Sequence, residues 1–131
     1  RGAKSLSSLG GVEYLAELFT GRHASHCTFR NICSKPIIAV VRGRQEFGPR
    51  ALGHRSLLAV PDSRDMVDRL NRLKSRQWYR PTGPMIADEA LEVVFGRVLK
   101  SKYMEFAPHV LSEVLDRFPA LAHFDGTARH Q

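Results

Sequence analysis

A polar stretch at residues 43–56 constrains the fold of this chain more than any other feature. It places three arginines, three glycines and one proline within fourteen positions. Neither an amphipathic helix nor a strand has this composition, because both need regularly spaced apolar residues. The β-branched run before it, residues 36–41, predicts a buried strand, and the apolar run after it, residues 56–60, predicts a second strand. We therefore expect a glycine-rich polar loop held between two strands.

The arginines of this loop, Arg44, Arg50 and Arg55, form a candidate anion site. A guanidinium keeps its charge and donates paired hydrogen bonds that match the oxygens of a phosphate or a carboxylate. Gly48 permits a close approach of the backbone to a ligand. Glu46 has two candidate roles, which are to orient one arginine or to hold a metal-bound nucleotide. A solvated basic turn is the competing interpretation, and the spacing alone does not decide between the two.

A second basic group follows, in which Lys74, Arg76 and Arg80 alternate with Trp78 and Tyr79. Cations at every second position lie on one side of an extended segment. If that side faces the loop arginines, the two groups form one cradle for a polyphosphate. The alternative is a basic edge of the sheet with Trp78 packed in the core.

Four stretches in order resemble one known family, the O-carbamoyltransferases of the nodulation-protein and antibiotic-tailoring type. Residues 43–56 are similar to the signature of the C-terminal region of these enzymes. Residues 68–81 resemble the Lys-x-Arg, aromatic, Arg-Pro segment of the family, and residues 85–95 resemble the strand and helix that follow it. Residues 123–129 resemble its terminal Asp-Gly-Thr-Ala-Arg signature. The match covers residues 37–131.

The resemblance implies the YrdC-like fold, a twisted open mixed sheet with helices packed against it. The residue pattern agrees with this α/β (α+β) class, because three or four helical stretches interleave with about five short strand-like stretches. The expected helices lie around residues 12–19, 66–73, 88–98 and 108–118. We expect residues 36–131 to form the family's domain. Residues 1–35 are then a poorly matched lead-in, a short helix and a surface insertion.

The resemblance also implies an activity. Enzymes of this family make carbamoyl adenylate from ATP and carbamoyl phosphate in the YrdC-like domain, and a kinase-like N-terminal domain that holds a metal transfers the carbamoyl group to a hydroxyl. The chain does not begin with Met, so we expect a C-terminal piece of such an enzyme, inactive by itself in the full reaction. We expect Mg²⁺ with the ATP, no metal ligands in this piece, and the N-terminal domain as a partner.

Roles follow from the matching positions. The three loop arginines are assigned to phosphate and carbamoyl phosphate, and the basic group at residues 74–80 to the phosphates of the nucleotide. Ser56 is expected to support them with a hydrogen bond. The terminal signature lies near the nucleotide site in the family, which adds Asp125 and Arg129 as candidates. A hairpin turn explains Asp125 equally well.

The charge of the chain favours an anionic partner. Lys and Arg number 20 against 13 Asp and Glu, which gives a net charge of +7 and a pI near 10.0. An RNA-binding module without catalysis is therefore an alternative function, although the aromatic content of 8% weighs against it. A domain that only docks on the rest of its own protein is a third interpretation. No apolar run approaches the ~20 residues of a membrane span, so we expect no membrane association and a cytoplasmic location.

Four potential zinc ligands gather in the stretch from residue 22 to 35, namely His23, His26, Cys27 and Cys33. Their spacing does not match the paired Cys-x-x-Cys arrangement of structural zinc sites. A surface insertion with ordinary reduced thiols is the interpretation that we prefer, and a disulfide is not expected in a cytosolic protein.

Overall fold

The computed structural model describes residue 5, residues 7–20 and residues 35–131. The chain divides into two compact units, Arg1–Val60 and Pro61–Gln131, which we call unit 1 and unit 2. Each unit is described by itself. Among the described residues, no helix has the length and apolar character needed to cross a membrane.

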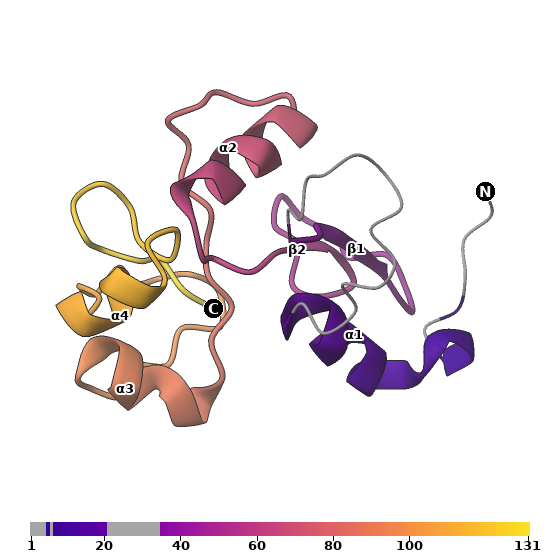
Figure 1. Ribbon diagram of the computed structural model, residues 1–131, viewed down its shortest axis with the longest axis horizontal. Helices are drawn as coiled ribbons and strands as arrows, with labels where there is room; N and C mark the ends of the chain where they lie inside the picture. Colours follow the sequence, from indigo (N-terminus) through magenta and orange to yellow (C-terminus); the bar gives the residue numbers. More distant parts are fainter. Residues whose placement is uncertain (1–4, 6, 21–34) are drawn as a thin grey trace. The chain divides into compact units, whose positions relative to one another are not determined.

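Unit 1 contains the helices η1 (Ser7–Leu9) and α1 (Gly11–Thr20) and the strands β1 (Ile38–Val41) and β2 (Arg55–Leu58). The strands pair antiparallel, with Ile38 opposite Leu58 and Val41 opposite Arg55 (Figure 1). Their antiparallel pairing places the intervening loop at one end of the two-stranded sheet. Both predicted strands and the loop between them are thereby confirmed, but the predicted burial is wrong, because no residue of β1 or β2 is buried and Val41 is 86% exposed.

The helices of unit 2 are α2 (Arg64–Leu73), η3 (Asp88–Ala90), α3 (Leu91–Phe95) and α4 (Ser112–Arg117), and turns and loops make up most of the rest of the unit. In Figure 1, α3 and α4 gather with the yellow C-terminal loop. Apolar residues of α3 and of the segments on either side of α4 pack together in one core. A short isolated helix is not stable by itself, so these helices depend on this packing. The buried members of this core are Leu91, Phe95, Val110, Leu121, Ala122 and Ala128.

Helices together with a two-stranded antiparallel sheet make an α+β arrangement, which confirms the predicted class. The described residues do not form the larger mixed sheet that we expected. The predicted strand near residue 85 is one example. It forms only two backbone hydrogen bonds, from Ile86 N to Gln131 O at 2.9 Å and from Gln131 N to Pro84 O at 3.0 Å, which is the pattern of a single parallel pairing step.

The expected helix at residues 88–98 is shorter than its apolar pattern suggested. α3 ends at Phe95 because Gly96 adopts a left-handed conformation with φ of 68° and its N–H bonds to Glu92 O. Val98 therefore lies beyond the helix and is 60% exposed, although the expected helix at residues 88–98 would have buried it.

Candidate functional site

The loop between β1 and β2 is cross-linked by its own side chains. Glu46 accepts a hydrogen bond from the Leu52 N–H through Oε1 at 2.8 Å, and its Oε2 lies 3.8 Å from the Arg55 guanidinium. Arg55 also donates a hydrogen bond to the Gly48 carbonyl. Glu46 thus orients one arginine, which is the first of its two candidate roles. Arg55 braces the loop and its side chain is only 37% exposed.

Other predicted residues of this loop divide into structural and accessible ones. Ser56 Oγ accepts a hydrogen bond from the Gly53 N–H at 3.0 Å and so fixes the end of the loop. Gly48 has φ of 122°, a conformation that favours glycine. Arg44 and Arg50 are exposed, so their guanidiniums are accessible to solvent at the loop surface.

The second basic group follows a tight turn rather than the extended segment that alternation predicted. At the end of α2, the Ser75 N–H bonds to Arg72 O at 3.1 Å and the Arg76 N–H bonds to Asn71 O at 3.0 Å. Ser75 has φ of 49°. These are the bonds and the left-handed residue of a Schellman motif, a standard end of a helix. The turn, and not a strand, places Lys74 and Arg76 close together.

Replacing Ser75 by glycine should stabilise unit 2. A residue with a Cβ pays an energetic cost in the left-handed region, whereas glycine does not, and the greater freedom of glycine in the unfolded chain offsets part of the gain. We expect the free energy of unfolding to rise by about 0.5–1 kcal/mol, measured by urea denaturation. Ser75→Ala is the control, because alanine keeps the Cβ. Equal stabilities of the glycine and alanine variants would contradict this explanation.

Asn71 fixes the path of the chain after this turn. Its side chain is 2% exposed. The amide Nδ2 donates hydrogen bonds to Trp78 O at 2.9 Å and Arg80 O at 3.0 Å, and Oδ1 accepts one from Arg76 Nε at 2.5 Å. One buried amide therefore ties the end of α2 to the segment that carries the basic and aromatic residues.

The three cations of this segment interact electrostatically. Burial lowers the pKa of Lys74, and the positive charge of Arg76 lowers it further. Burial likewise lowers the pKa of Arg76, with Arg80 as the second cause. Partly desolvated cations that repel one another favour the binding of an anion, because an anion relieves both penalties.

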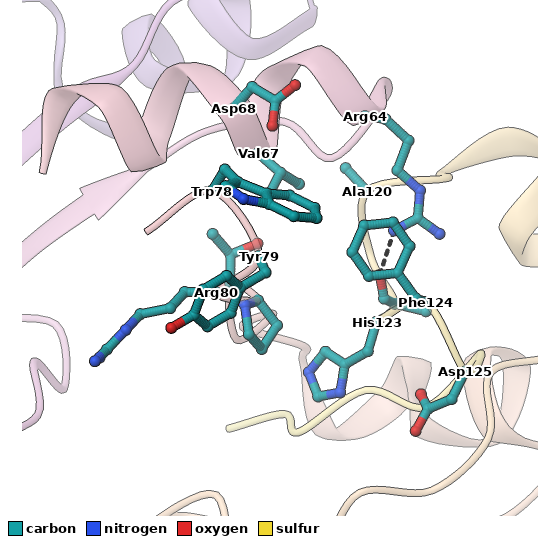
Figure 2. A pocket seen from close by; sticks show the side chains of 13 residues that line it. Arg64, Val67, Asp68, Trp78, Tyr79, Arg80, Ala120, His123, Phe124 and Asp125 are labelled. Atoms are coloured by element: carbon teal, nitrogen blue, oxygen red, sulfur yellow. Dashed lines mark hydrogen bonds between the residues drawn. The ribbon is translucent and has the colours of Figure 1, made fainter. Parts of the chain in front are cut away.

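A pocket of about 560 Å³ lies beside this segment within unit 2. Arg64 and Val67 of α2 line it, together with residues 78–82 and the C-terminal segment between residues 120 and 125. Figure 2 shows Trp78 and Tyr79 on one side of the pocket and Phe124 on the other, with His123 and Asp125 near the C-terminal segment. The lining is mostly apolar, with charged groups among the side chains around it.

Arg64 holds the C-terminal side of the pocket against α2. Its guanidinium donates a hydrogen bond to the Ala122 carbonyl at 2.9 Å and lies 5.5 Å from the centre of the Phe124 ring. The dashed line in Figure 2 marks this hydrogen bond. Arg64 is exposed, yet the partners of its guanidinium come from a segment far along the chain.

The terminal signature forms a compact turn. Asp125 Oδ1 accepts hydrogen bonds from the N–H and the hydroxyl of Thr127 at 2.9 and 2.7 Å, and the His123 N–H bonds to Thr127 O at 2.7 Å. Gly126 has φ of 80°. Asp125 therefore stabilises the turn and also lines the pocket. Arg129 is exposed next to the buried Ala128.

The pKa of His123 lies below its usual 6.5, chiefly because the ring is partly buried. Asp125 opposes this shift, whereas the charges of Arg129 and Arg64 reinforce it. The folded state thus binds fewer protons here than the unfolded state. The contribution of His123 to stability is complete above pH 6.5 and is lost as the pH falls through its folded pKa.

His123→Gln should make the stability of unit 2 less dependent on pH in this window. The glutamine keeps a polar side chain but does not titrate, so the loss of stability between about pH 7.5 and about pH 5.5 should be smaller than in the parent. Urea denaturation at both pH values measures the difference. His109→Gln is the control, since it leaves His123 in place. An unchanged dependence on pH in His123→Gln would contradict the assignment.

Sequence reasoning missed three residues that shape this part of unit 2. Asn71 and Arg64 are polar residues of a helix, which are usually solvated, and Phe124 lies in the terminal signature without a role that its local sequence indicates. The described structure brings together Lys74, Arg76 and Arg80 in unit 2, and separately the loop residues in unit 1. The prediction that both groups form one cradle stays a prediction.

Comparison with known proteins identifies the family. The sequence model described as Carbamoyltransferase C-terminus matches residues 29–131. The chain belongs to this carbamoyltransferase C-terminal family. The loop arginines, the basic group after α2 and the terminal turn all lie within the matched range, so the family assignment includes each candidate site.

Curated relatives of the carbamoyltransferase C-terminal family are much longer than this chain. Nodulation protein U of Sinorhizobium fredii is 37% identical over 116 residues, which are 85% of this chain and 21% of that protein. The 3'-hydroxymethylcephem-O-carbamoyltransferase of Streptomyces clavuligerus is 44% identical over 95 residues, which are 72% of this chain and 18% of that enzyme. The chain therefore spans about a fifth of the length of these relatives.

The candidate zinc ligands of the sequence, namely His23, His26, Cys27 and Cys33, lie outside the described residues. Among the residues that are described, no group of three or more His, Cys, Asp and Glu side chains could hold a metal ion.

Proposed function

We propose that this chain binds ATP and carbamoyl phosphate and forms carbamoyl adenylate for a carbamoyltransferase. The observation that carries the proposal is the basic group Lys74, Arg76 and Arg80, which is held together by the turn at the end of α2 and by the side-chain hydrogen bonds of Asn71. Burial and like charge also lower the pKa of Lys74 and Arg76. A nucleotide polyphosphate has the charge to relieve that repulsion. Membership of the carbamoyltransferase C-terminal family supports the choice of reaction.

The reaction needs one molecule of water to balance. Water takes the phosphoryl group of carbamoyl phosphate, and inorganic phosphate and carbamate result. A carbamate oxygen then attacks the α-phosphorus of ATP, and the bond to the β,γ-diphosphate breaks, so that pyrophosphate leaves. Both steps concentrate negative charge, which fixed arginines and lysines stabilise without a nucleophilic side chain. Mg²⁺ would come with ATP as the counter-ion of its phosphates.

The two groups of cations are assigned to different reactants. Arg44 and Arg50, accessible on a loop that Glu46 and Arg55 brace, are proposed to bind carbamoyl phosphate. The basic group after α2 is proposed to bind the nucleotide phosphates, with Arg129 and Asp125 near the nucleotide. Forked guanidinium donors match the paired oxygens of a carbamoyl phosphate.

The acceptor and the partner are also proposals. The name of the Streptomyces clavuligerus relative specifies a hydroxymethyl group that is carbamoylated, which supports a hydroxyl group as the acceptor. We propose that the remaining length found in such relatives supplies the domain that transfers the carbamoyl group, and that this domain is the partner of the present chain.

Calorimetric titration tests the binding half of the proposal. The chain should bind ATP with Mg²⁺, and it should bind carbamoyl phosphate in a separate titration. Arg50→Ala should weaken carbamoyl phosphate binding by tenfold or more, because a charge-assisted hydrogen bond is lost. Absence of heat from both ligands, with a chain shown to be folded by circular dichroism, would refute the proposal.

RNA binding is a second candidate, because Trp78 and Tyr79 are 70% and 56% exposed beside Arg80. Exposed aromatic rings next to cations also stack unpaired bases of single-stranded nucleic acid. A salt-dependent gel shift of RNA that persists in Arg50→Ala would favour this candidate. Absence of a shift would remove it.

A further inference from the structure

The Arg55 guanidinium, at the end of the loop between β1 and β2, is already held by groups of that loop. Its Nη2 donates a hydrogen bond to the Gly48 carbonyl, and its Nε lies 3.8 Å from Glu46 Oε2. The guanidinium is also partly exposed to solvent. An anion that arrives from solvent therefore competes for Arg55 with the groups that hold it.

The Glu46 carboxylate is a poorly matched partner for Arg55. The distance of 3.8 Å between Arg55 Nε and Glu46 Oε2 is longer than the roughly 2.7–3.2 Å of an N–H···O hydrogen bond. Oε2 is buried and accepts no hydrogen bond within the described part of the chain, whereas Oε1 accepts one from the Leu52 N–H at 2.8 Å. One oxygen is thus fixed to the loop backbone, and the other is held near Arg55 by charge alone.

A phosphate group matches Arg55 better than this carboxylate does. Phosphate oxygens accept paired, charge-assisted hydrogen bonds from a guanidinium, and a phosphate dianion carries twice the charge of a carboxylate. Arg44 and Arg50 of the same loop are exposed and add positive charge at its surface. An exchange of Glu46 for a phosphate on Arg55 would therefore replace a loose ion pair by hydrogen-bonded ones.

Arg55 can change partners without a change in the strands. Its backbone belongs to β2 and pairs with Val41, so only the guanidinium has to turn. The Gly48 carbonyl can release it, because Gly48 is a glycine with φ of 122° in open surroundings. Of the described residues, only its chain neighbours come within 4 Å of the position that a Cβ of Gly48 would take.

We propose that Glu46 is an internal anion that holds Arg55 until a phosphate group displaces it. This inference rests on the proposed function, in which the displacing ligand is carbamoyl phosphate, and it makes Arg55 the third cation for that ligand. The apparent affinity of a site falls with the fraction of molecules in which the site is free. Glu46 therefore sets how strongly an anion must bind to enter the loop.

Glu46→Gln tests this competition directly. Glutamine keeps the length of the side chain and an oxygen that can accept the Leu52 N–H, but it removes the charge that holds Arg55. In calorimetric titrations, inorganic phosphate and carbamoyl phosphate should each bind about fivefold more tightly than to the parent, the size of one ion pair near the surface. Glu13→Gln is the matched control, because Glu13 is an exposed acid of α1. It should bind both ligands like the parent.

A double-mutant cycle determines whether Arg55 carries the effect. In a chain that also has Arg55→Ala, Glu46→Gln should no longer tighten binding, because the contact that it removes is already lost. If Glu46 only braced the loop, Glu46→Gln would weaken binding, and this result would overturn the inference. An equal gain in Glu13→Gln would also overturn it, since the gain would then come from net charge.

NMR of the parent chain gives a test that does not depend on the folding of a variant. Saturating inorganic phosphate should shift the signal of the Arg55 Nε–H, whose partner changes from Glu46 to the phosphate. A signal that stays in place while phosphate is bound would overturn the inference. Equal binding of carbamoyl phosphate by the parent and by Glu46→Gln would overturn the role of Glu46 and leave the proposed function standing. Tighter phosphate binding by Glu46→Gln without any binding of ATP would support the role of Glu46 and refute the proposed function.

Discussion

Replacing Lys74 by alanine should weaken ATP binding by tenfold or more, which corresponds to about 1.4 kcal/mol. Burial and the charge of Arg76 lower the pKa of Lys74, so its ammonium is partly desolvated before any ligand arrives. An ion pair with a phosphate in such surroundings is stronger than one at a fully solvated surface. The hydrogen bonds of the turn use the Lys74 backbone and the Arg76 side chain, so this variant should retain its fold.

Lys100→Ala is the matched control for this experiment. Lys100 is an exposed lysine of unit 2 whose Nζ lies 2.6 Å from Asp88 Oδ2, and it is not among the pocket residues. Calorimetry should give the same ATP affinity for Lys100→Ala as for the parent. Raising the salt concentration should weaken binding to the parent more than to Lys74→Ala, because fewer charges contact the phosphates in the variant. Equal ATP affinities of Lys74→Ala and Lys100→Ala would contradict the assignment.

Replacing Asn71 by leucine should lower the free energy of unfolding by about 3 kcal/mol. The change keeps a similar volume but removes three hydrogen bonds, and it takes the Asn71 partner from the carbonyls of Trp78 and Arg80 and from Arg76 Nε. Buried groups that lose their partner pay the cost of desolvation in full. The thermal midpoint should fall by more than about 10 °C, measured by circular dichroism.

Two further variants test whether the effect of Asn71→Leu comes from the Asn71 amide itself. Asn71→Asp keeps an acceptor for Arg76 but loses both donors, so it should also destabilise the chain. Arg72→Ala changes the neighbouring exposed side chain, whose partner Asp65 lies 3.9 Å away. A surface ion pair of this kind contributes little, so Arg72→Ala should cost less than about 0.5 kcal/mol. A similar small effect of Asn71→Leu would show that the amide does not organise this segment.

Local patterns in the sequence predicted the elements whose causes are local. The loop between β1 and β2 follows from its polar, glycine-rich composition between two apolar runs, and α1 and α2 follow from apolar residues at helical spacing. Glu46 lies beside Arg55, an arrangement that the sequence left as one of two candidate roles for Glu46, and the sequence did not indicate that Arg55 also braces the loop.

The remainder could not be predicted because it depends on contacts between distant residues. Alternating charges suggested an extended segment after α2, but the buried Asn71 and the left-handed Ser75 produce a turn. The partners of Arg64, Ala122 and Phe124, lie far along the chain, so no local pattern indicates them. A periodicity argument reports which side chains share a face, and not which segment covers that face.

The most direct test of the account is phosphorus NMR of the chain mixed with Mg²⁺, ATP and carbamoyl phosphate. If the chain forms carbamoyl adenylate, pyrophosphate and inorganic phosphate should appear in equal amounts, together with a new adenylate signal. ATP alone should give no pyrophosphate, and Lys74→Ala should give much less of it than Lys100→Ala. If the folded chain binds both ligands but no pyrophosphate forms, the central claim is wrong.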